Sequence, residues 1–360
     1  MSKKRLCVVG AGRVGRLHVG NIVERLTHRA EVTALCDPSR PAADRLAADY
    51  GIPKVTASLE EALSGGEFDG AVITTPTFTH HKLAITAIEA GLHVHLEKPM
   101  AMNVGECAQI TTAAQRAGVA LQIGFMRRFD RDFIAAADLL RSGEIGVPMV
   151  IKSLTNGPGL PPAWANDIAT SNGMIAEVNS HDLDTVCWFA DAEPVDITVR
   201  VADFKGAERG VTTEHFYDTL VAVVTFESGA IASVTGVCPV DYGYDARVEV
   251  TCTAGMVEVG RPGPGGLATT AAGTGRRCEA VYPSWRNRFA DAYVREMVEF
   301  LEAIDGGPIR VGAAEGTRAV ALAVAGTVSM LEGRSVPVAE VNDPAVIPWW
   351  QTAAGGVRGG

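Results

Sequence analysis

The stretch Leu6-Cys7-Val8-Val9-Gly10-Ala11-Gly12-Arg13-Val14-Gly15 decides the fold class of this chain of 360 residues. Its apolar run predicts a buried strand, and a G-x-G-x-x-G turn follows directly and opens a helix. Gly10 permits the tight turn, Gly12 lets a pyrophosphate approach the backbone, and Gly15 lets helix and strand pack closely. Free N–H groups at the helix N-terminus suit phosphates. The stretch therefore predicts a dinucleotide-binding turn. Its expected contacts are Gly10, Gly12, Arg13 and Val14.

An acidic residue follows at the distance that such a turn requires. Asp37 lies 22 residues after Gly15, at the end of a second apolar run. A carboxylate there accepts hydrogen bonds from the adenosine ribose and repels a 2′-phosphate, which favours NAD over NADP. A helix N-cap is the alternative role, and the two roles are compatible. Arg40 is close enough to pair with a 2′-phosphate, so NADP stays open as the alternative cofactor.

The first 125 residues alternate short apolar runs with longer helical stretches, which predicts a doubly wound parallel sheet. The expected strands are Leu6–Val9, Glu31–Cys36, Gly70–Thr74, His93–Leu96 and Ala120–Gly124. The expected helices are Val14–Leu26, Pro41–Tyr50, Leu59–Leu63, His80–Ala90 and Val104–Ala117. Continuous apolar runs without polar alternation are typical of strands that are covered on both faces.

The pattern changes after residue 125, where apolar and polar residues alternate in several runs. This predicts a largely antiparallel sheet with helices on one face. The expected strands are Met149–Leu154, Val195–Ala202, Thr219–Phe226, Ile231–Gly236, Ala246–Cys252 and Met256–Val259, with helices near Phe133–Arg141, Asp291–Ile304 and Ala313–Leu331. We therefore expect domains at residues 1–125 and 126–340 and a tail at 341–360. The Gly/Pro-rich stretch Gly260–Gly275 is expected to be a mobile loop, as a lid or an interface arm.

Composition narrows the class of partner. The net charge is −10, and no Lys/Arg-rich run follows the first residues, which disfavours nucleic acid. No apolar run reaches the roughly 20 residues that span a bilayer. The seven cysteines are scattered, which predicts reduced thiols of a cytoplasmic protein and neither a disulfide frame nor a zinc site. The expected partner is a small molecule.

Two strand ends carry candidate chemistry. Lys98 follows the expected strand His93–Leu96 within Glu97-Lys98-Pro99. A lysine beside a nicotinamide can bind a substrate hydroxyl and stabilise the developing oxyanion. A surface Glu–Lys pair before a proline turn is the alternative interpretation of the same residues. Thr74-Thr75-Pro76 ends the strand before it, and strand ends of this topology line the cofactor crevice. A proline turn that enters a helix is the alternative there.

The segment Gly173–Asp184 carries a second candidate group. If it is helical, Glu177, His181 and Asp184 fall at i, i+4 and i+7 on one face. Histidine titrates near about 6.5 and suits proton removal from an alcohol, and a neighbouring carboxylate can orient it. A solvated charged face and a metal site are the alternatives. No third metal ligand is evident, so we expect no metal.

Taken together, these motifs resemble the Gfo/Idh/MocA family of oxidoreductases over nearly the whole chain. The resemblance rests on residues 10–15, Glu97-Lys98-Pro99, Gly124–Asp130, residues 173–184, Tyr242–Asp245, Trp285, and Arg288-Phe289 leading into Ala292-Tyr293. It implies an N-terminal Rossmann domain and a C-terminal α/β domain whose open sheet forms homodimers or homotetramers. It also implies a cis peptide before Pro99, and the middle and late motifs look most like inositol dehydrogenases.

The resemblance also implies roles for single residues. Lys98 matches the lysine that binds the hydroxyl, and His181 matches the acid/base. The positions that usually approach the cofactor are Thr74, Thr75, Pro76, His80, Glu97 and Arg127. The positions that tend to line the sugar site are Asn156, Tyr242, Tyr244 and Trp285, with Glu177, His181 and Asp184 beside them.

One departure bears on the substrate. Inositol dehydrogenases usually carry Asp where this chain has Glu177, so the carboxylate arm is one methylene longer. A cationic aminosugar, as in an aminoglycoside, is compatible with that change. The sequence thus predicts an NAD-dependent dehydrogenase that oxidises a ring hydroxyl of a sugar, aminosugar or cyclitol to a ketone. An NAD-dependent glycosidase with a transient keto-sugar and a non-catalytic sugar sensor are the alternatives.

Overall fold

The computed structural model describes residues 3–260 and 282–353, which divide into two compact units. Unit 1 comprises Met1–Phe129 and Asp291–Thr317, and unit 2 comprises Asp130–Ala290 and Arg318–Gly360. The sequence prediction divided the two domains at residue 125, set a tail at 341–360, and did not include the return of Asp291–Thr317 to the first unit. Apart from Gly260, the predicted mobile loop Gly260–Gly275 lies outside the described residues.

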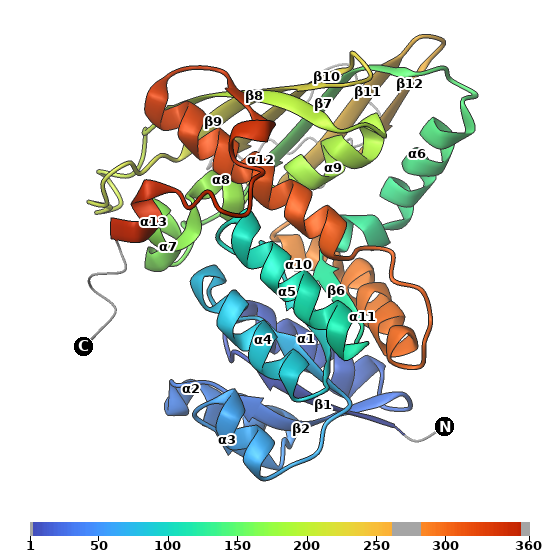
Figure 1. The fold of residues 1–360 in the computed structure, drawn as a ribbon, viewed down its shortest axis with the longest axis vertical. Coiled ribbons are helices and arrows are strands. Elements are labelled where there is room, and N and C mark those ends of the chain that lie inside the picture. Colours follow the sequence, from blue (N-terminus) through green and yellow to red (C-terminus); the bar gives the residue numbers. More distant parts are fainter. Residues whose placement is uncertain (1–2, 261–281, 354–360) are drawn as a thin grey trace. The chain divides into compact units, whose positions relative to one another are not determined.

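Unit 1 is built on a six-stranded parallel sheet in the order β3-β2-β1-β4-β5-β6 (Figure 1). Its strands are β1 (Lys4–Val9), β2 (Ala30–Cys36), β3 (Lys54–Thr56), β4 (Gly70–Ile73), β5 (His93–Glu97) and β6 (Leu121–Gly124). The doubly wound sheet predicted from the sequence is confirmed. Strand order reverses between β1 and β4, and in such sheets ligands bind beyond the carboxyl ends at that point.

Helices bury the apolar strands of unit 1. They are α1 (Arg13–Gly20), which continues as a π-helical turn over Asn21–Arg25, α2 (Arg40–Tyr50), α3 (Leu59–Ser64), α4 (His80–Glu89), α5 (Val104–Ala117) and α11 (Ala290–Ile304). Helix α11 comes from the far end of the chain. Its Met297, Phe300 and Leu301 belong to the same core cluster as Leu6 and Val8 of β1. This apolar stripe explains why the late segment packs with the first unit.

Unit 2 contains a seven-stranded sheet in the order β12-β11-β7-β10-β9-β8-β13. Its strands are β7 (Pro148–Asn156), β8 (Pro194–Ala202), β9 (Thr219–Phe226), β10 (Ile231–Val237), β11 (Asp245–Cys252), β12 (Met256–Val259) and β13 (Val336–Pro337). Only β7 and β10 pair in parallel among these strands, so the predicted mainly antiparallel sheet is confirmed.

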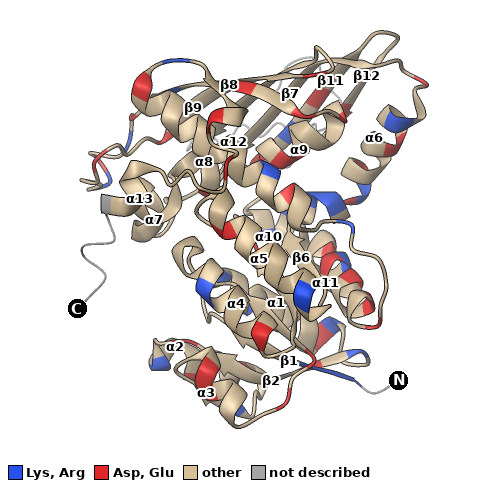
Figure 2. Ribbon diagram, in the orientation of Figure 1, with Lys and Arg blue, Asp and Glu red and all other residues tan. Residues whose placement is uncertain are grey.

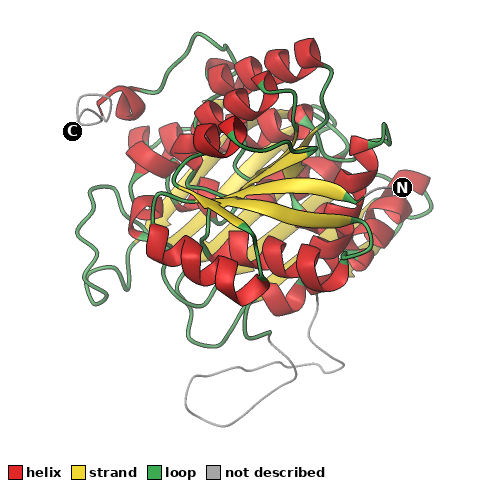
Figure 3. Ribbon diagram, turned by 90° about the horizontal axis from the view of Figure 1, so that it is seen from below, coloured by secondary structure: helices red, strands yellow, loops and turns green. Residues whose placement is uncertain are grey.

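This second sheet is covered on one face. Figure 1 shows α9 (Ser180–Ala190) and α12 (Ala313–Glu332) on the same side of it, and Figure 3 colours the helices and strands of the chain by type. Ser329 of α12 accepts a hydrogen bond from the Val199 backbone N–H of β8. Along β9 the residues alternate, so that Val224 is buried whereas Val223 on the opposite face is 41% exposed. The open face predicted from the alternation is therefore present.

The segment Gly173–Asp184 forms two helices rather than one. Helix α8 spans Met174–Glu177 and α9 begins at Ser180. Between them, the Asn179 amide donates hydrogen bonds to an Asp182 carboxylate oxygen at 2.9 Å and to the Thr235 carbonyl at 3.3 Å. The expected single helical face is wrong, because these bonds tie the break to β10 and to the start of α9.

The remaining helices are α6 (Arg131–Ser142), α7 (Ile168–Ser171), α10 (Trp285–Arg288) and α13 (Trp349–Ala353). The expected tail is attached to unit 2 through α13. Trp350 is buried there and donates its indole N–H to Asn172 Oδ1 at 3.0 Å.

Acidic and basic residues are interspersed along the chain in both units (Figure 2). Six cysteines fall in the described part of the chain, and all are buried and free of disulfides. Within residues 3–260 and 282–353, no helix combines the length and the apolar character needed to cross a membrane.

Candidate active site

The glycine turn after β1 has the shape that a dinucleotide pyrophosphate requires. Gly10 has φ +108°, and a Cβ on Gly15 would lie 1.9 Å from the Gly10 carbonyl oxygen. Both positions therefore exclude a side chain. A Cβ on Gly12, by contrast, would meet no atom within 4 Å, so open space lies where the backbone would receive the phosphates. The turn fits the group that the sequence predicted.

Asp37 fixes this turn to the end of β2. Its carboxylate accepts hydrogen bonds from the backbone N–H groups of Ala11 and Ser39, each at 2.7 Å. The residue at the N-cap of α2 is Ser39, so Asp37 stabilises the approach to the helix without occupying the cap position. Arg40 donates to the Val55 carbonyl at 2.8 Å and lies 3.5 Å from a carboxylate oxygen of Asp44. Arg40 is the cation that the sequence offered as a partner for a 2′-phosphate, and its guanidinium is engaged by Val55 and Asp44.

The end of β4 lies against the same turn. The Thr74 hydroxyl is 3.1 Å from both the Val9 and the Gly10 carbonyl oxygens. Thr75 and Pro76 follow and lead through a short 3₁₀ turn into α4. At the start of α4, the His80 ring lies between two carbonyl oxygens. Its Nδ1 is 2.8 Å from Pro99 O and its Nε2 is 2.8 Å from Thr75 O. Burial lowers the pKa of His80, and the ring links the ends of β4 and β5.

The end of β5 presents Lys98 from a buried support. Glu97 accepts a hydrogen bond from the His18 ring through Oε1 at 2.9 Å and from the Lys98 backbone N–H through Oε2 at 3.2 Å. Gly124 of β6 leaves room for this carboxylate, because a Cβ there would lie 2.9 Å from Glu97 Oε2. The peptide between Lys98 and Pro99 is cis, as the family resemblance implied.

Arg127 lies just beyond β6, in the 3₁₀ turn Met126–Phe129, and is wholly buried. The structure thus brings the expected cofactor residues to the carboxyl edge of one parallel sheet. They are Gly10, Gly12, Arg13, Val14, Asp37, Thr74, Thr75, Pro76, His80, Glu97, Lys98 and Arg127. Arg40 belongs to the same edge but is turned to its own helix and to β3.

Unit 2 holds the second expected group. His181 and Asp184 lie on α9 and are buried, whereas Glu177 ends α8 and is partly exposed. Asp182 anchors the start of α9 to β7 by accepting hydrogen bonds from Ser153 at 2.6 Å and Thr155 at 2.7 Å. His181 is therefore carried by a helix end that three polar contacts, counting Asn179, hold in place.

The four residues expected to line the sugar site have different surroundings in unit 2. Asn156 donates to the Tyr242 hydroxyl at 2.7 Å and accepts from the Val237 backbone N–H at 3.1 Å. Burial raises the pKa of Tyr242. Tyr244 is buried and packs edge-on against Phe289, which is a core position. Trp285 begins α10, and the Arg286 guanidinium lies 4.5 Å from its ring centre.

Sequence reasoning missed four buried polar residues. Asp182 lies within the segment Gly173–Asp184, where the spacing gives it no role, although it anchors α9 to β7. His18, His95 and Glu296 lie beside Glu97, on α1, β5 and α11. The polar residues in otherwise apolar helical and strand runs were the available signal. Their meeting could not be deduced locally, because Glu296 lies 278 positions after His18.

The fold and these residues define a dinucleotide-dependent dehydrogenase. A glycine turn, an acidic residue after β2 and a lysine after β5 share one edge of a doubly wound sheet. Residues 4–125 match the model described as "Oxidoreductase family, NAD-binding Rossmann fold", and residues 133–258 match the GFO/IDH/MocA C-terminal domain. The chain belongs to the Gfo/Idh/MocA family of NAD-dependent oxidoreductases.

Named relatives agree with this membership. A scyllo-inositol 2-dehydrogenase (NAD(+)) of Bacillus subtilis is 30% identical over 84% of this chain and 86% of its own length. Inositol 2-dehydrogenase 3 of Saccharopolyspora erythraea is 29% identical over 95% and 97%. The crystal structure of a myo-inositol dehydrogenase of Lactobacillus casei, in complex with NAD(H) and myo-inositol, aligns at a TM-score of 0.80 and 25% identity, covering 97% of this chain and all of that one.

Proposed function

We propose that this oxidoreductase converts a secondary ring hydroxyl of a cyclitol, sugar or aminosugar to a ketone. The observation that carries the proposal is Lys98, whose backbone is fixed by Glu97 on the sheet edge that also bears the glycine turn and Asp37. An ammonium group at that edge can bind a hydroxyl oxygen and stabilise the alkoxide that forms there. The names of the relatives, which are inositol dehydrogenases, support the same chemistry.

The residues that would hold NAD follow from the geometry. The N–H groups after Gly12 and the start of α1 would receive the pyrophosphate, and Asp37 would accept hydrogen bonds from the ribose hydroxyls. Bound NAD supplies the hydride acceptor. Thr74, Pro76 and His80 follow the adjoining end of β4, where Thr74 contacts the Val9 carbonyl and His80 contacts the Pro99 carbonyl.

Proton transfer is assigned to residues of this chain. Lys98 donates a hydrogen bond to the substrate oxygen and supports its negative charge, while His181 takes up the hydroxyl proton. Asp182, with Ser153 and Thr155, orients the helix end that carries His181. The proposal assigns Lys98 and His181 to one substrate hydroxyl.

The residues proposed to choose the substrate are polar and lie in unit 2. The Asn156–Tyr242 pair offers amide and phenol groups that suit ring hydroxyls. Glu177 adds a carboxylate at the end of α8, and its longer arm suits an amine or a more distant hydroxyl. An aminosugar, including an aminoglycoside, is therefore kept beside the inositols as a proposed substrate class.

The open face of the second sheet supports self-association as a homodimer or homotetramer. Several of its outward residues are apolar and 39–53% exposed, and isolated monomers seldom expose such patches. They include Val150, Val221, Val223, Ile231 and Met256.

The test is NADH formation by the purified protein with NAD⁺ and a panel of ring polyols. The panel contains myo-inositol, scyllo-inositol, glucose, a simple glucoside and a pseudotrisaccharide aminoglycoside. Steady NADH with one member is the expected result and identifies the ring class. Glucoside cleavage without NADH accumulation would indicate the glycosidase alternative. NAD binding without turnover of any member would contradict the proposal.

A further inference from the structure

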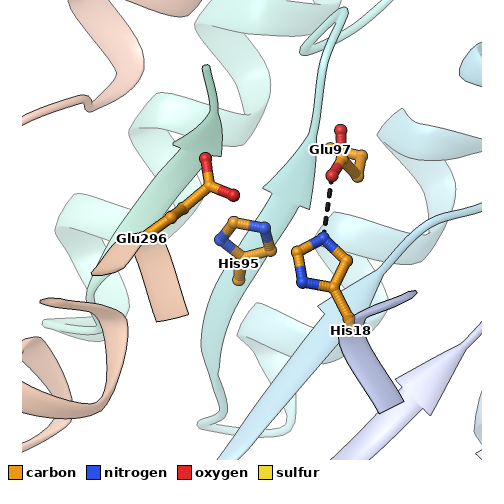
Figure 4. A group of neighbouring side chains, drawn as sticks. All are labelled: His18, His95, Glu97 and Glu296. Atoms are coloured by element: carbon orange, nitrogen blue, oxygen red, sulfur yellow. Dashed lines mark hydrogen bonds and ion pairs between the residues drawn. The ribbon is translucent and has the colours of Figure 1, made fainter. Parts of the chain in front are cut away.

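Four titratable side chains meet inside unit 1 at a place that the proposed mechanism does not use. They are His18 of α1, His95 and Glu97 of β5, and Glu296 of α11 (Figure 4). One nitrogen or carboxylate oxygen from each lies within 4.8 Å of the others. Glu97 is 5% exposed and the other three are wholly buried. We call these four residues the buried cluster.

Within the buried cluster, Glu97 has the partners that an ionised carboxylate needs. Its two oxygens accept hydrogen bonds from the His18 ring and the Lys98 backbone N–H. Burial raises the pKa of Glu97, but the hydrogen bond and charge of His18 outweigh that effect and the net shift is downward. Since an ionised carboxylate only accepts, His18 Nε2 must be the donor.

Glu296 has none of these partners. Neither of its carboxylate oxygens has a hydrogen-bond partner among the described residues, and its side chain is fully buried. An ionised carboxylate in that position would be desolvated without compensation, which proteins avoid by neutralising the group. Burial raises the pKa of Glu296 well above its usual range, and the charges of Glu97 and Glu299 act in the same direction.

His95 does not supply a compensating positive charge. Burial, with a smaller effect of His18, lowers the pKa of His95 to about 3, so its ring is neutral. The Gln122 amide nitrogen donates to the Glu296 backbone carbonyl at 2.9 Å and lies 3.3 Å from His95 Nδ1. Because an amide N–H faces Nδ1, that nitrogen accepts and the ring proton is on Nε2.

This tautomer disfavours a metal ion in the buried cluster. Two imidazoles and two carboxylates are a common ligand set for zinc. A ligating histidine must offer an unprotonated nitrogen and usually donates its other N–H to an acceptor. In His95, Nε2 carries the proton and Nδ1 faces the Gln122 amide. A proton on Glu296 neutralises the site without disturbing these contacts.

We propose that Glu296 is a neutral carboxylic acid in the working enzyme, so that Glu97 is the single anion of the buried cluster and, held by His18, fixes the backbone of Lys98. His18 and Glu97 are then positioning residues for Lys98. The carboxyl proton of Glu296 prevents two anions from competing for the same His18 donor.

The other charged groups around the buried cluster leave this assignment intact. On α11, Glu299 accepts from the Arg310 backbone N–H at 2.7 Å and pairs with its guanidinium at 3.3 Å. On β5, Lys98 follows Glu97 along the chain. Helix α1 contributes the His18 ring and β6 contributes the Gln122 amide, while Tyr293 and Phe300 of α11 place aromatic rings beside His18 and His95.

Substitution of Glu296 by Gln tests the proton directly. Gln keeps the shape of a neutral acid, so E296Q removes only the cost of keeping a carboxyl protonated. A group whose pKa is raised by folding loses stability as pH rises from its unfolded value, about 4.3, towards the raised value. The unfolding equilibrium constant of the unmodified protein should therefore grow relative to that of E296Q as pH rises above about 5, by up to about tenfold per pH unit for as long as Glu296 keeps its proton in the folded protein.

Infrared spectroscopy supplies a second readout that does not depend on catalysis. The unmodified protein should show the carbonyl stretch of a protonated carboxylic acid at neutral pH, and E296Q should lack it. E299Q is the matched control on the same helix and should keep the band. Absence of the band, or an E296Q variant that is destabilised equally at every pH, would overturn the proposal. So would stoichiometric metal in the purified protein that E296Q fails to bind.

The link to Lys98 rests on the proposed function and has its own test. His18→Phe removes the donor to Glu97 and should lower kcat by about tenfold or more and shift the pH profile of kcat, whereas His18→Gln retains an N–H donor and should restore part of the rate. Equal loss in both variants with an unshifted profile would contradict positioning. If no substrate of the panel is turned over, the infrared and unfolding measurements still decide the state of Glu296.

Discussion

The two sheets of this chain place their chemistry by different rules. Strands β1 to β6 are parallel and buried on both faces, and the functional candidates of unit 1 lie where those strands end. The sheet of unit 2 has one covered and one open face, and its candidates come mostly from helices and loops beside it. In the first sheet, the position of a residue at the end of a strand indicates a functional role. In the second sheet, such a role is indicated only by which residues lie next to one another in the folded chain.

Asp37 and Asn156 illustrate the difference. Asp37 could be found by counting from Gly15, because strand, turn and helix lengths are fixed in a doubly wound unit. Asn156 bonds to Tyr242, which lies 86 positions away and is reached through three further strands. Only the family resemblance suggested that pair. Predictions from single residues should therefore be more secure for unit 1 than for unit 2.

The largest expected effect is at a strand end. Lys98→Met removes the group that stabilises the substrate oxyanion and should lower kcat/KM by about 10³- to 10⁴-fold with NAD binding retained. Steady-state kinetics and NAD titration measure the two effects. Lys82→Met is the control, since Lys82 is an exposed residue of α4, 3.7 Å from Glu60. Equal losses in the two variants would remove Lys98 from the mechanism.

A helix residue of unit 2 comes next. His181→Ala should lower kcat by about 10²- to 10³-fold, because the hydroxyl proton loses its acceptor. The pH profile of the remaining kcat should lack the rise with pH that deprotonation of the His181 imidazole gives in the unmodified enzyme. Substituting Thr185, whose hydroxyl donates to the His181 carbonyl at 2.6 Å, by Val is the control for damage to α9. Full activity of His181→Ala would contradict its assignment.

The glycine turn should separate folding from binding. Gly15→Ala places a methyl group 1.9 Å from the Gly10 carbonyl and should cost about 2–4 kcal/mol of stability. Gly12→Ala meets open space in the protein and should leave stability nearly unchanged while weakening NAD, whose phosphates need that space. Thermal unfolding with and without NAD compares them. Normal NAD affinity in Gly12→Ala would mean that the phosphates lie elsewhere.

The smallest effect on the monomer is expected at the open sheet. Val223→Asp should change the free energy of unfolding of the protomer by less than about 1 kcal/mol, because this side chain is 41% exposed, yet it should break self-association. Sedimentation velocity measures the assembly. Val224→Asp, on the buried face of the same strand, should instead unfold the unit. Unchanged assembly in Val223→Asp would place the interface elsewhere.

Much of the architecture could be read from periodicity, and the failures have physical causes. The missed strand β3 contains one apolar residue among Lys54-Val55-Thr56, so it carries almost no pattern. The break before α9 depends on Asn179 reaching Thr235, a tertiary contact that overrides helical spacing. The assignment of α11 to unit 1 depends on Met297 and Phe300 fitting a core that is formed by residues near the other end of the chain.

For the site, local motifs predicted the position of those residues whose place is fixed by the end of a single strand. The glycine turn, Asp37 and Lys98 occupy the predicted edge. The support beneath Lys98 escaped prediction because His18, His95 and Glu296 come from three elements that only the folded chain brings together. Tyr244, which the family resemblance places in the sugar site, is buried and packs against Phe289, and its role in substrate binding stays a prediction.

The most direct measurement follows the fate of one hydrogen. A turned-over ring polyol is labelled with deuterium at the carbon that becomes the ketone, and the nucleotide product is analysed by mass spectrometry. The proposed reaction predicts NADH that carries the deuterium, formed together with an equal amount of cyclic ketone. Unlabelled NADH, or consumption of the polyol without any reduced nucleotide, would contradict oxidation of the ring hydroxyl by this enzyme.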